Sequence, residues 1–270
     1  MQGSSRAAAA VGQQALDAAL TGAADPGRLG EDLFGMGATL DSSAALRRAL
    51  TDPTRDADAK GDLAKRLFLG KVSNEALAVL MTLVGERWST ERDLTDTVER
   101  LAVQSVLASA EAARTADAVE DELFRFERVV AGTPALRDAL LDRQADPAAK
   151  AALVDRLLTA KARPQTVRLA RQAVLAPRGR RFAAVIEDYL EVIAQRRKQL
   201  TATVTSAIEL TAAQRVRLAG SLTAMYDRPV HLQTVVDPNV LGGIRVEIGD
   251  EVVDGTVLRK LDGARRHFGG

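Results

Sequence analysis

The sequence contains no cysteine, and only 3% of its 270 residues are aromatic. The missing cysteines exclude disulfides, thiolate metal sites and a cysteine nucleophile. With so few aromatic side chains, the hydrophobic cores must be built from Leu, Val and Ala, and this composition favours helices. No G-x-x-x-x-G-K-[ST] motif occurs, which excludes a P-loop nucleotide site.

The sequence also lacks a charge excess and a long apolar run. Its 37 basic and 36 acidic side chains leave a net charge of +1, so no overall field attracts nucleic acid or an anionic membrane. The longest apolar candidate, Ala76 to Val84, is half of the roughly eighteen residues that a membrane span needs. In Met1 to Leu20, polar residues interrupt any signal-peptide core. We therefore expect no direct membrane insertion, and any membrane role must pass through a partner.

Catalytic and metal-binding patterns are absent as well. His231 and His267 are the only histidines, and neither has metal-ligand spacing. The acidic residues are scattered over helix faces, and no Ser-His-Asp set can be assembled. The sequence therefore predicts no catalytic residue, no metal site and no cofactor. A binding or structural role is the better interpretation.

What the sequence does contain is an internal repeat with an offset of ninety residues. Between positions 45 and 71, thirteen of twenty-seven residues recur ninety positions later without a gap. They are Ala45, Leu46, Arg47, Ala49, Leu50, Asp52, Asp56, Ala59, Lys60, Leu63, Arg66, Leu67 and Lys71. The expected helix caps recur in the same register, Ser43 with Thr133 and Asp56 with Asp146. Chance similarity between Ala-, Leu- and Arg-rich helices is the alternative. The repeat predicts two related helical-bundle domains, 1–105 and 106–198. Within the first, Gly22, Pro26, Gly27 and Gly30 predict a loop from Thr21 to Gly30.

A small α/β domain, 199–270, is predicted after the helices. From Leu200 the apolar period changes to two, as expected for strands, first to Ile208 and again over 230–236. Thr211 and Gln214 form a capping box for a helix to about Tyr226. Ile244, Val246 and Ile248 alternate in a third strand, and Val252-Val253 forms a short fourth strand. Asp254 is the expected N-cap of a final helix.

This last stretch resembles the C-terminal signature of the delta subunit of F-type ATP synthases, related to the mitochondrial oligomycin-sensitivity-conferring protein. Thr256 stands where that family most often has serine. The resemblance covers roughly Leu123 to the end, and the extra helical copy resembles the longer forms in actinobacteria. The residues that carry the signature are Asp237, Leu241, Gly242, Gly243, Gly249, Asp250, Asp254 and Gly255.

The resemblance implies a non-catalytic peripheral-stalk subunit on the cytoplasmic face of the cell membrane. A helical domain would bind the N-terminal segment of an ATP synthase alpha subunit as a helix in a groove. The C-terminal domain would bind the end of the b subunit. No nucleic acid and no self-oligomer are expected. The alternatives are a helical adaptor unrelated to ATP synthase, and an enzyme accessory or nucleic-acid module.

Three residues are candidates for partner binding. Leu16 and Leu20, on the first helix, would form a groove wall, and the rival wall is the stretch from Val103 to Leu107. Trp88 is an expected packing anchor that could also serve at an interface. Two basic clusters, at 178–181 and 196–198, are interpreted as a loop and as a helix C-terminus. An acidic partner for the first cluster stays open.

Overall fold

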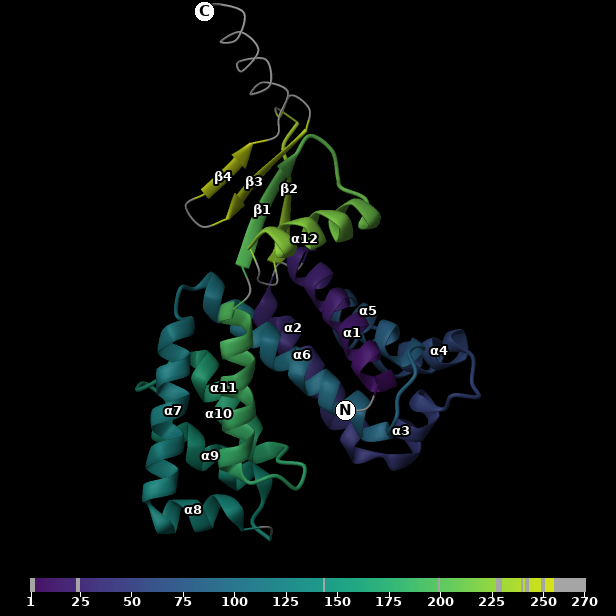
Figure 1. The fold of residues 1–270 in the computed structure, drawn as a ribbon. Coiled ribbons are helices and arrows are strands. Elements are labelled where there is room, and N and C mark those ends of the chain that lie inside the picture. Colours follow the sequence, from purple (N-terminus) through teal and green to yellow (C-terminus); the bar gives the residue numbers. More distant parts are fainter. Residues whose placement is uncertain are drawn as a thin grey trace, which may run out of the picture. The chain divides into compact units, whose positions relative to one another are not determined.

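The computed structural model describes residues 3–22, 25–142, 144–198, 200–226, 230–238, 240, 243–248 and 251–254. The chain divides into two compact units, Met1–Ile193 and Ala194–Gly270. The first unit is helical, and the described part of the second combines a mixed sheet with helix α12 (Figure 1). The predicted fold class, mainly α with a small C-terminal α/β part, is confirmed.

The helices follow one another through short loops and bury a core of Leu, Val and Ala side chains. Their bounds are α1 Gly3–Gly22, α2 Pro26–Ser42, α3 Ala44–Thr51, α4 Ala57–Phe68, α5 Asn74–Gly85, α6 Glu91–Ala112, α7 Ala116–Gly132, α8 Pro134–Leu141, α9 Pro147–Leu158, α10 Pro164–Leu175 and α11 Phe182–Lys198. Aromatic packing is rare, and the edge-to-face pair of Phe126 and Phe182 joins α7 to the start of α11.

The ninety-residue offset of the sequence recurs in the helices. Adding ninety to the bounds of α2, α3, α4 and α5 gives the bounds of α7, α8, α9 and α10. A long-range hydrogen bond recurs too. Asp32 accepts from the Ser73 backbone N–H at 2.8 Å, and Glu122 accepts from the Arg163 N–H at 2.8 Å. A fold duplication explains why equivalent carboxylates hold the starts of equivalent helices.

Helix α6 belongs to both copies. It ends ninety residues after α1 ends, so it corresponds to α1 as the first helix of the second copy. It also begins within one residue of the position equivalent to α11, so it is the last helix of the first copy. The predicted boundary after residue 105 falls inside this helix, and the predicted domain bounds stay predictions.

The start of α2 corrects one expectation. The glycines and Pro26 between Thr21 and Gly30 predict a loop, but the helix begins at Pro26. The Asp25 carboxylate accepts from the Arg28 N–H at 3.1 Å, and proline suits the first helical position. The expected caps at Ser43 and Asp146 are confirmed by their bonds from the Leu46 N–H at 3.2 Å and the Ala148 N–H at 2.9 Å. Asp56 and Thr133 stand at the expected cap positions, but their side chains make no capping bond.

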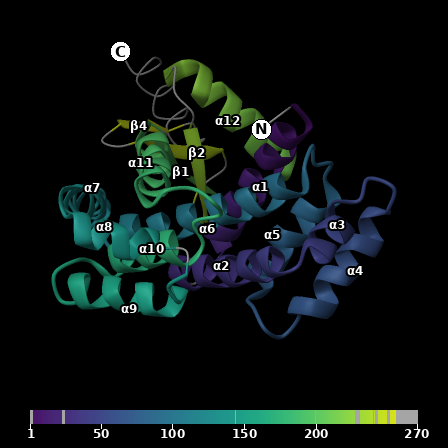
Figure 2. The same ribbon diagram turned by 90° about the horizontal axis from the view of Figure 1, so that it is seen from below.

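Glycine on α2 permits a close crossing with α6. A Cβ at Gly30 would lie 2.8 Å from Val106 Cγ2 and 3.1 Å from the Ala102 carbonyl oxygen. The equivalent position on α7 is Glu120, which has a long side chain. Helices α2 and α6 make an extensive contact along their length (Figure 2). The second copy therefore lacks the glycine that permits this close approach in the first copy.

The described sheet of the second unit has the order β2-β1-β3-β4. Strand β1 (Leu200–Ser206) pairs in parallel with β2 (Val230–Val236) and antiparallel with β3 (Ile244–Ile248), which pairs with β4 (Glu251–Asp254). Helix α12 (Ala212–Tyr226) contributes Leu222 to a separate core. Its capping box is confirmed, since the Thr211 N–H donates to Gln214 Oε1 at 2.8 Å.

Three of the signature residues lie within the described strands and loops. The Asp237 N–H donates to the Ser206 carbonyl at 2.9 Å. Gly243 has a φ of +82°, a conformation that favours glycine. Asp254 is the last residue of β4, opposite Arg245. The final predicted helix lies outside the described residues, as do the signature positions Leu241, Gly242, Gly249, Asp250 and Gly255.

Candidate functional site

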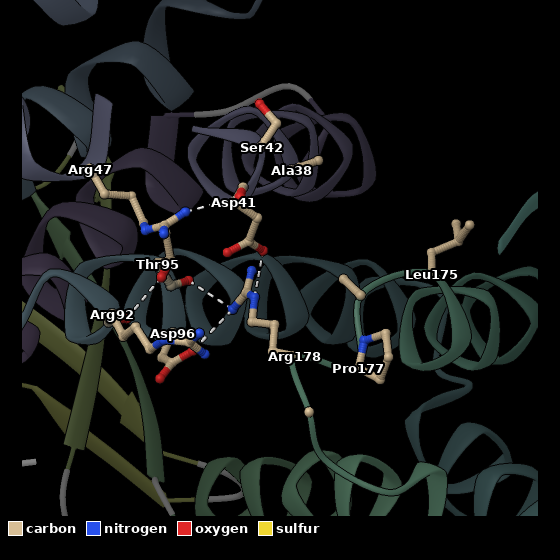
Figure 3. A pocket seen from close by; sticks show the side chains of 12 residues that line it. Ala38, Asp41, Ser42, Arg47, Arg92, Thr95, Asp96, Leu175, Pro177 and Arg178 are labelled. Atoms are coloured by element: carbon tan, nitrogen blue, oxygen red, sulfur yellow. Dashed lines mark hydrogen bonds and ion pairs between the residues drawn. The ribbon is translucent and has the colours of Figure 1, made fainter. Parts of the chain in front are cut away.

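In the described part of the first unit, a buried cluster of charged side chains lies where the loop between α10 and α11 meets α2 and α6. Arg178 projects from this loop, and only 8% of its side chain is exposed. Its Nε donates to Asp41 at 2.6 Å, and its Nη1 donates to Asp96 at 3.2 Å (Figure 3). The same Nη1 also donates to Glu99 at 2.8 Å. Arg178 therefore joins the second helical copy to α2 and α6.

Glu99 is the centre of the cluster and is only 4% exposed. Besides Arg178, it accepts from Arg180 Nη2 at 2.9 Å and from the Tyr189 hydroxyl at 3.0 Å. Arg180 also pairs with Asp188 at 2.7 Å. A buried carboxylate without partners is very unfavourable, so these three donors explain why an acid is tolerated in the core.

The cluster shifts the pKa of its own members. Burial lowers the pKa of the Arg178 guanidinium, but Glu99 and Asp41 together outweigh it, and the pKa lies above its usual value. Arg180 behaves in the same way beside Glu99 and Asp188. Burial, with the negative charge of Glu99, raises the pKa of the Tyr189 hydroxyl well above 10.0. Both arginines therefore stay charged and Tyr189 stays neutral at physiological pH.

The backbone at this loop is held in an uncommon conformation. Arg178 has a φ of +48° and Gly179 a φ of +79°, both in the left-handed region. For a non-glycine residue this costs about 1–2 kcal/mol. The ion pairs of the Arg178 side chain with Asp41 and Glu99 offset that cost.

An open hollow of about 610 Å³ lies beside the cluster. Two arginines on its wall, Arg47 and Arg178, donate to groups of the same chain. Arg47 donates to the carbonyl oxygens of Leu40 and Asp41 at 2.9 Å each, and Arg178 has its three carboxylates. The open question about an acidic partner is thereby answered for Arg178 and Arg180, whose acidic partners lie in the same chain. The site binds two helical copies to each other, and its groups are not arranged for a reaction.

Replacing Tyr189 by Phe tests the hydroxyl of this cluster. Its bond to a charged group contributes about 1.5–3 kcal/mol, so the variant should be less stable at neutral pH. The raised pKa means that the folded state keeps the proton longer than the unfolded state. This contribution is complete below the ordinary pKa of 10.0 and is lost as the pH rises further. The difference between the two proteins in urea unfolding should therefore shrink above pH 10, and a constant difference would contradict this assignment.

A second contact between the copies involves α2 and α10. Arg168 on α10 pairs with Glu31, and its guanidinium lies 4.2 Å from the ring centroid of Phe34. Phe34 is only 3% exposed. On α6, the Ser105 hydroxyl donates to the Pro26 carbonyl at 2.8 Å. Helix α2 therefore covers the face that α6 and α10 form together (Figure 2).

The equivalent face of the first copy is formed by α1 and α5, which pack against each other. Ala15, Ala19 and Ala78 stand ninety residues before Ser105, Ser109 and Arg168. Ala78 is exposed, and Ala15 and Ala19 are half-buried. We name these three alanines the α1–α5 face. In the described part of the first unit, it lacks the helix that covers its counterpart.

The predicted partner-binding residues fall into different environments. Leu16 is fully buried in the core, whereas Leu20 is half-buried at its edge. In the rival stretch, Val103, Val106 and Leu107 are all buried. Trp88 is half-buried against the core, and its indole N–H donates to the Leu83 carbonyl at 2.8 Å. These positions stay predictions as partner contacts.

Sequence reasoning missed Glu99 and the charge cluster around it. One feature of the sequence could have indicated a buried acid, because Glu99 lies within one turn of the apolar residues Val98 and Leu101 on a long helix. Its partners are 79 to 90 residues away in the sequence, and no local pattern connects them. Among the described residues, no group of three acidic or histidine side chains could hold a metal ion. None of the helices in the described part is long and apolar enough to cross a membrane.

Comparison with known proteins gives a consistent result. The family model described as ATP synthase delta (OSCP) subunit matches residues 98–268. This match begins inside α6 and covers the second helical copy and the C-terminal unit. A protein of Kineococcus radiotolerans named ATP synthase subunit delta is 49% identical over 269 residues, covering 99% of this chain and 98% of its own. Proteins with the same name from Streptomyces avermitilis and Acidothermus cellulolyticus are 44% and 43% identical over 267 and 272 residues, covering 98% and 99% of both chains.

Proposed function

The chain belongs to the ATP synthase delta (OSCP) family, and from this premise we propose how its two units divide their binding partners. It is a structural subunit of the peripheral stalk of a membrane-associated F-type ATP synthase and not an enzyme. An adaptor unrelated to ATP synthase is not favoured, because the relatives match over the whole chain.

We propose that the α1–α5 face of the first copy binds the N-terminal segment of an alpha subunit as a helix. The supporting observation is that α2 already covers the equivalent face of the second copy. Arg168 and Ser105 bind α2 there, whereas Ala15, Ala19 and Ala78 leave small, partly exposed side chains. Small residues let a partner helix approach closely, and its apolar side chains would supply the contact area.

The C-terminal unit would bind the end of the b subunit, and this contact would hold the protein at the cytoplasmic face of the membrane. This unit has its own core, formed by residues of β1, β2, β3 and α12. A separate core supports independent docking, so the two partners would attach to two different units. Neither contact requires a second copy of the chain, and we expect no self-oligomer.

Introducing negative charge on the α1–α5 face tests the proposal. Changing Ala15 and Ala19 together to Glu should weaken binding of a synthetic alpha N-terminal peptide about ten-fold or more, since a buried carboxylate would oppose the apolar contact. The measurement is a fluorescence titration of the full chain. Binding of the b subunit end should not change, because b docks on the other unit.

A matched variant separates this face from the rest of α1. Ala10 is exposed and lies on the side of the helix away from Ala15 and Ala19. Ala10→Glu should therefore leave the affinity for the alpha peptide unchanged. Equal loss in both variants, or no loss in either one, would contradict the proposed binding face.

A further inference from the structure

The outer face of α7 carries the same side chains as the covered face of α2. Asp121 and Phe124 stand ninety residues after Glu31 and Phe34. The aromatic ring is conserved between the copies, and so is the acid one turn before it. Their surroundings differ sharply, since Phe34 is 3% exposed and Phe124 is 55% exposed.

The covered copy shows what this pair of residues can bind. On α2, one arginine of a neighbouring helix satisfies both residues. Arg168 pairs with Glu31 and lies over the face of Phe34. A guanidinium in this position gains from the carboxylate charge and from the ring quadrupole together. An acid and an aromatic residue one turn apart therefore form a seat for a cation on a helix.

On α7, Asp121 and Phe124 form the equivalent seat, and Asp121 already has a cation beside it on the same helix. Arg125 Nη2 donates to Asp121 at 3.0 Å, and both side chains are about 70% exposed. An exposed pair of this kind contributes only about 0.3–0.5 kcal/mol, so it does not hold Asp121 against a better-placed cation. The carboxylate also has a second oxygen that can accept from a partner.

From this comparison we propose that the α7 face, Asp121 and Phe124, is a docking surface for a helix of another subunit of the complex. That helix presents an arginine or lysine to the seat, as α10 presents Arg168 to α2. This contact is additional to the alpha and b contacts proposed above and does not depend on either of them.

In a second copy of this chain, the arginine that makes the equivalent contact is already engaged. Arg168 already serves Glu31 and Phe34 of its own chain. The equivalent residue of α5 is Ala78, which carries no charge. The occupant that we propose is therefore a different polypeptide with a basic residue on a helix.

Site-specific photo-cross-linking in the purified ATP synthase complex tests this proposal. A benzoylphenylalanine at position 124 preserves the aromatic character of the seat and should form an adduct with one other subunit. Mapping should place the adduct within one helical turn of an Arg or Lys. The same probe at Leu69, which is 66% exposed, is the control for random collision and should give no adduct with that peptide.

The second part of the test changes the charge at position 121. In the complex that carries the probe, Asp121→Lys should lower the adduct yield about ten-fold, and Asp121→Glu should restore it. Asp121 is exposed, so the melting temperature should not change in either variant. The proposal is overturned by a missing adduct, by an adduct with this chain itself, or by a yield that does not respond to the charge.

Discussion

Replacing Arg178 by Met is expected to lower the free energy of unfolding of the helical unit by about 3–5 kcal/mol. The guanidinium is the group that joins Asp41, Asp96 and Glu99, and its removal leaves Glu99 buried with a reduced set of donors. Met is similar in length and also has a Cβ, so the positive φ at this position costs the same in both proteins. The loss therefore reports the charge interaction.

Urea unfolding can be followed through Trp88, the only tryptophan of the chain, which packs against the core of the helical unit. The matched control is Arg55→Met, because Arg55 makes an exposed pair with Asp52 at 3.6 Å. That variant should cost at most about 0.5 kcal/mol. Similar losses in both variants would show that the cluster is no stronger than a surface pair.

A double-mutant cycle separates the pair energy from the penalty of the orphaned charge. Glu99→Met alone leaves two arginines without their shared carboxylate. When it is combined with Arg178→Met, the buried charge and its partner disappear together. The combined loss should be clearly smaller than the sum of the single losses, because an apolar pair can replace a buried ion pair at low cost. Additive losses would mean that Arg178 and Glu99 do not interact.

Gly30→Ala is expected to destabilise the protein by about 1–3 kcal/mol, although alanine is the better helix former. The added methyl group would lie 2.8 Å from Val106 Cγ2 and 3.1 Å from the Ala102 carbonyl. The valine side chain can rotate, but the carbonyl oxygen belongs to the α6 backbone and cannot move without shifting the helix. The crossing of α2 and α6 would have to widen.

Gly35 on the same helix provides the matched control. No described atom lies within 4 Å of a Cβ at this position. Gly35→Ala should therefore stabilise the protein by about 0.5–1 kcal/mol, through helix propensity alone. Thermal melts of the two variants should shift in opposite directions. A shift of the same sign would mean that the close crossing does not limit residue size at Gly30.

These two contacts matter for a stalk subunit because its task is mechanical. The close crossing joins α2 to α6 within the first copy, and the Arg178 cluster joins the second copy to both helices. Since α6 is shared, no flexible linker separates the copies. We therefore expect a mechanical load on one copy to reach the other through the α2–α6 crossing and the Arg178 cluster.

The fold class could be predicted from the sequence because its signals are local. The period of two from Leu200 onward indicated strands, and the register and burial of Val246 and Ile248 agree. Helix caps such as Ser43 and the Thr211–Gln214 box were also correctly predicted. The loop predicted before Gly30 was wrong, because glycine there serves contact with another helix and not a turn.

By itself, the sequence determined the helical content, the ninety-residue repeat and the family to which the chain belongs. These depend on periodicity, capping and identity along the chain, all of which act over a few residues or compare equivalent positions. Only the tertiary structure decided that α6 serves both copies, that α2 covers the α6–α10 face, and that Arg178 reaches Glu99. The residues of that last contact are separated by 79 positions, and each of them resembles a solvated surface charge when considered alone. Burial and pairing are properties of the folded arrangement, so they could not be obtained from local pattern.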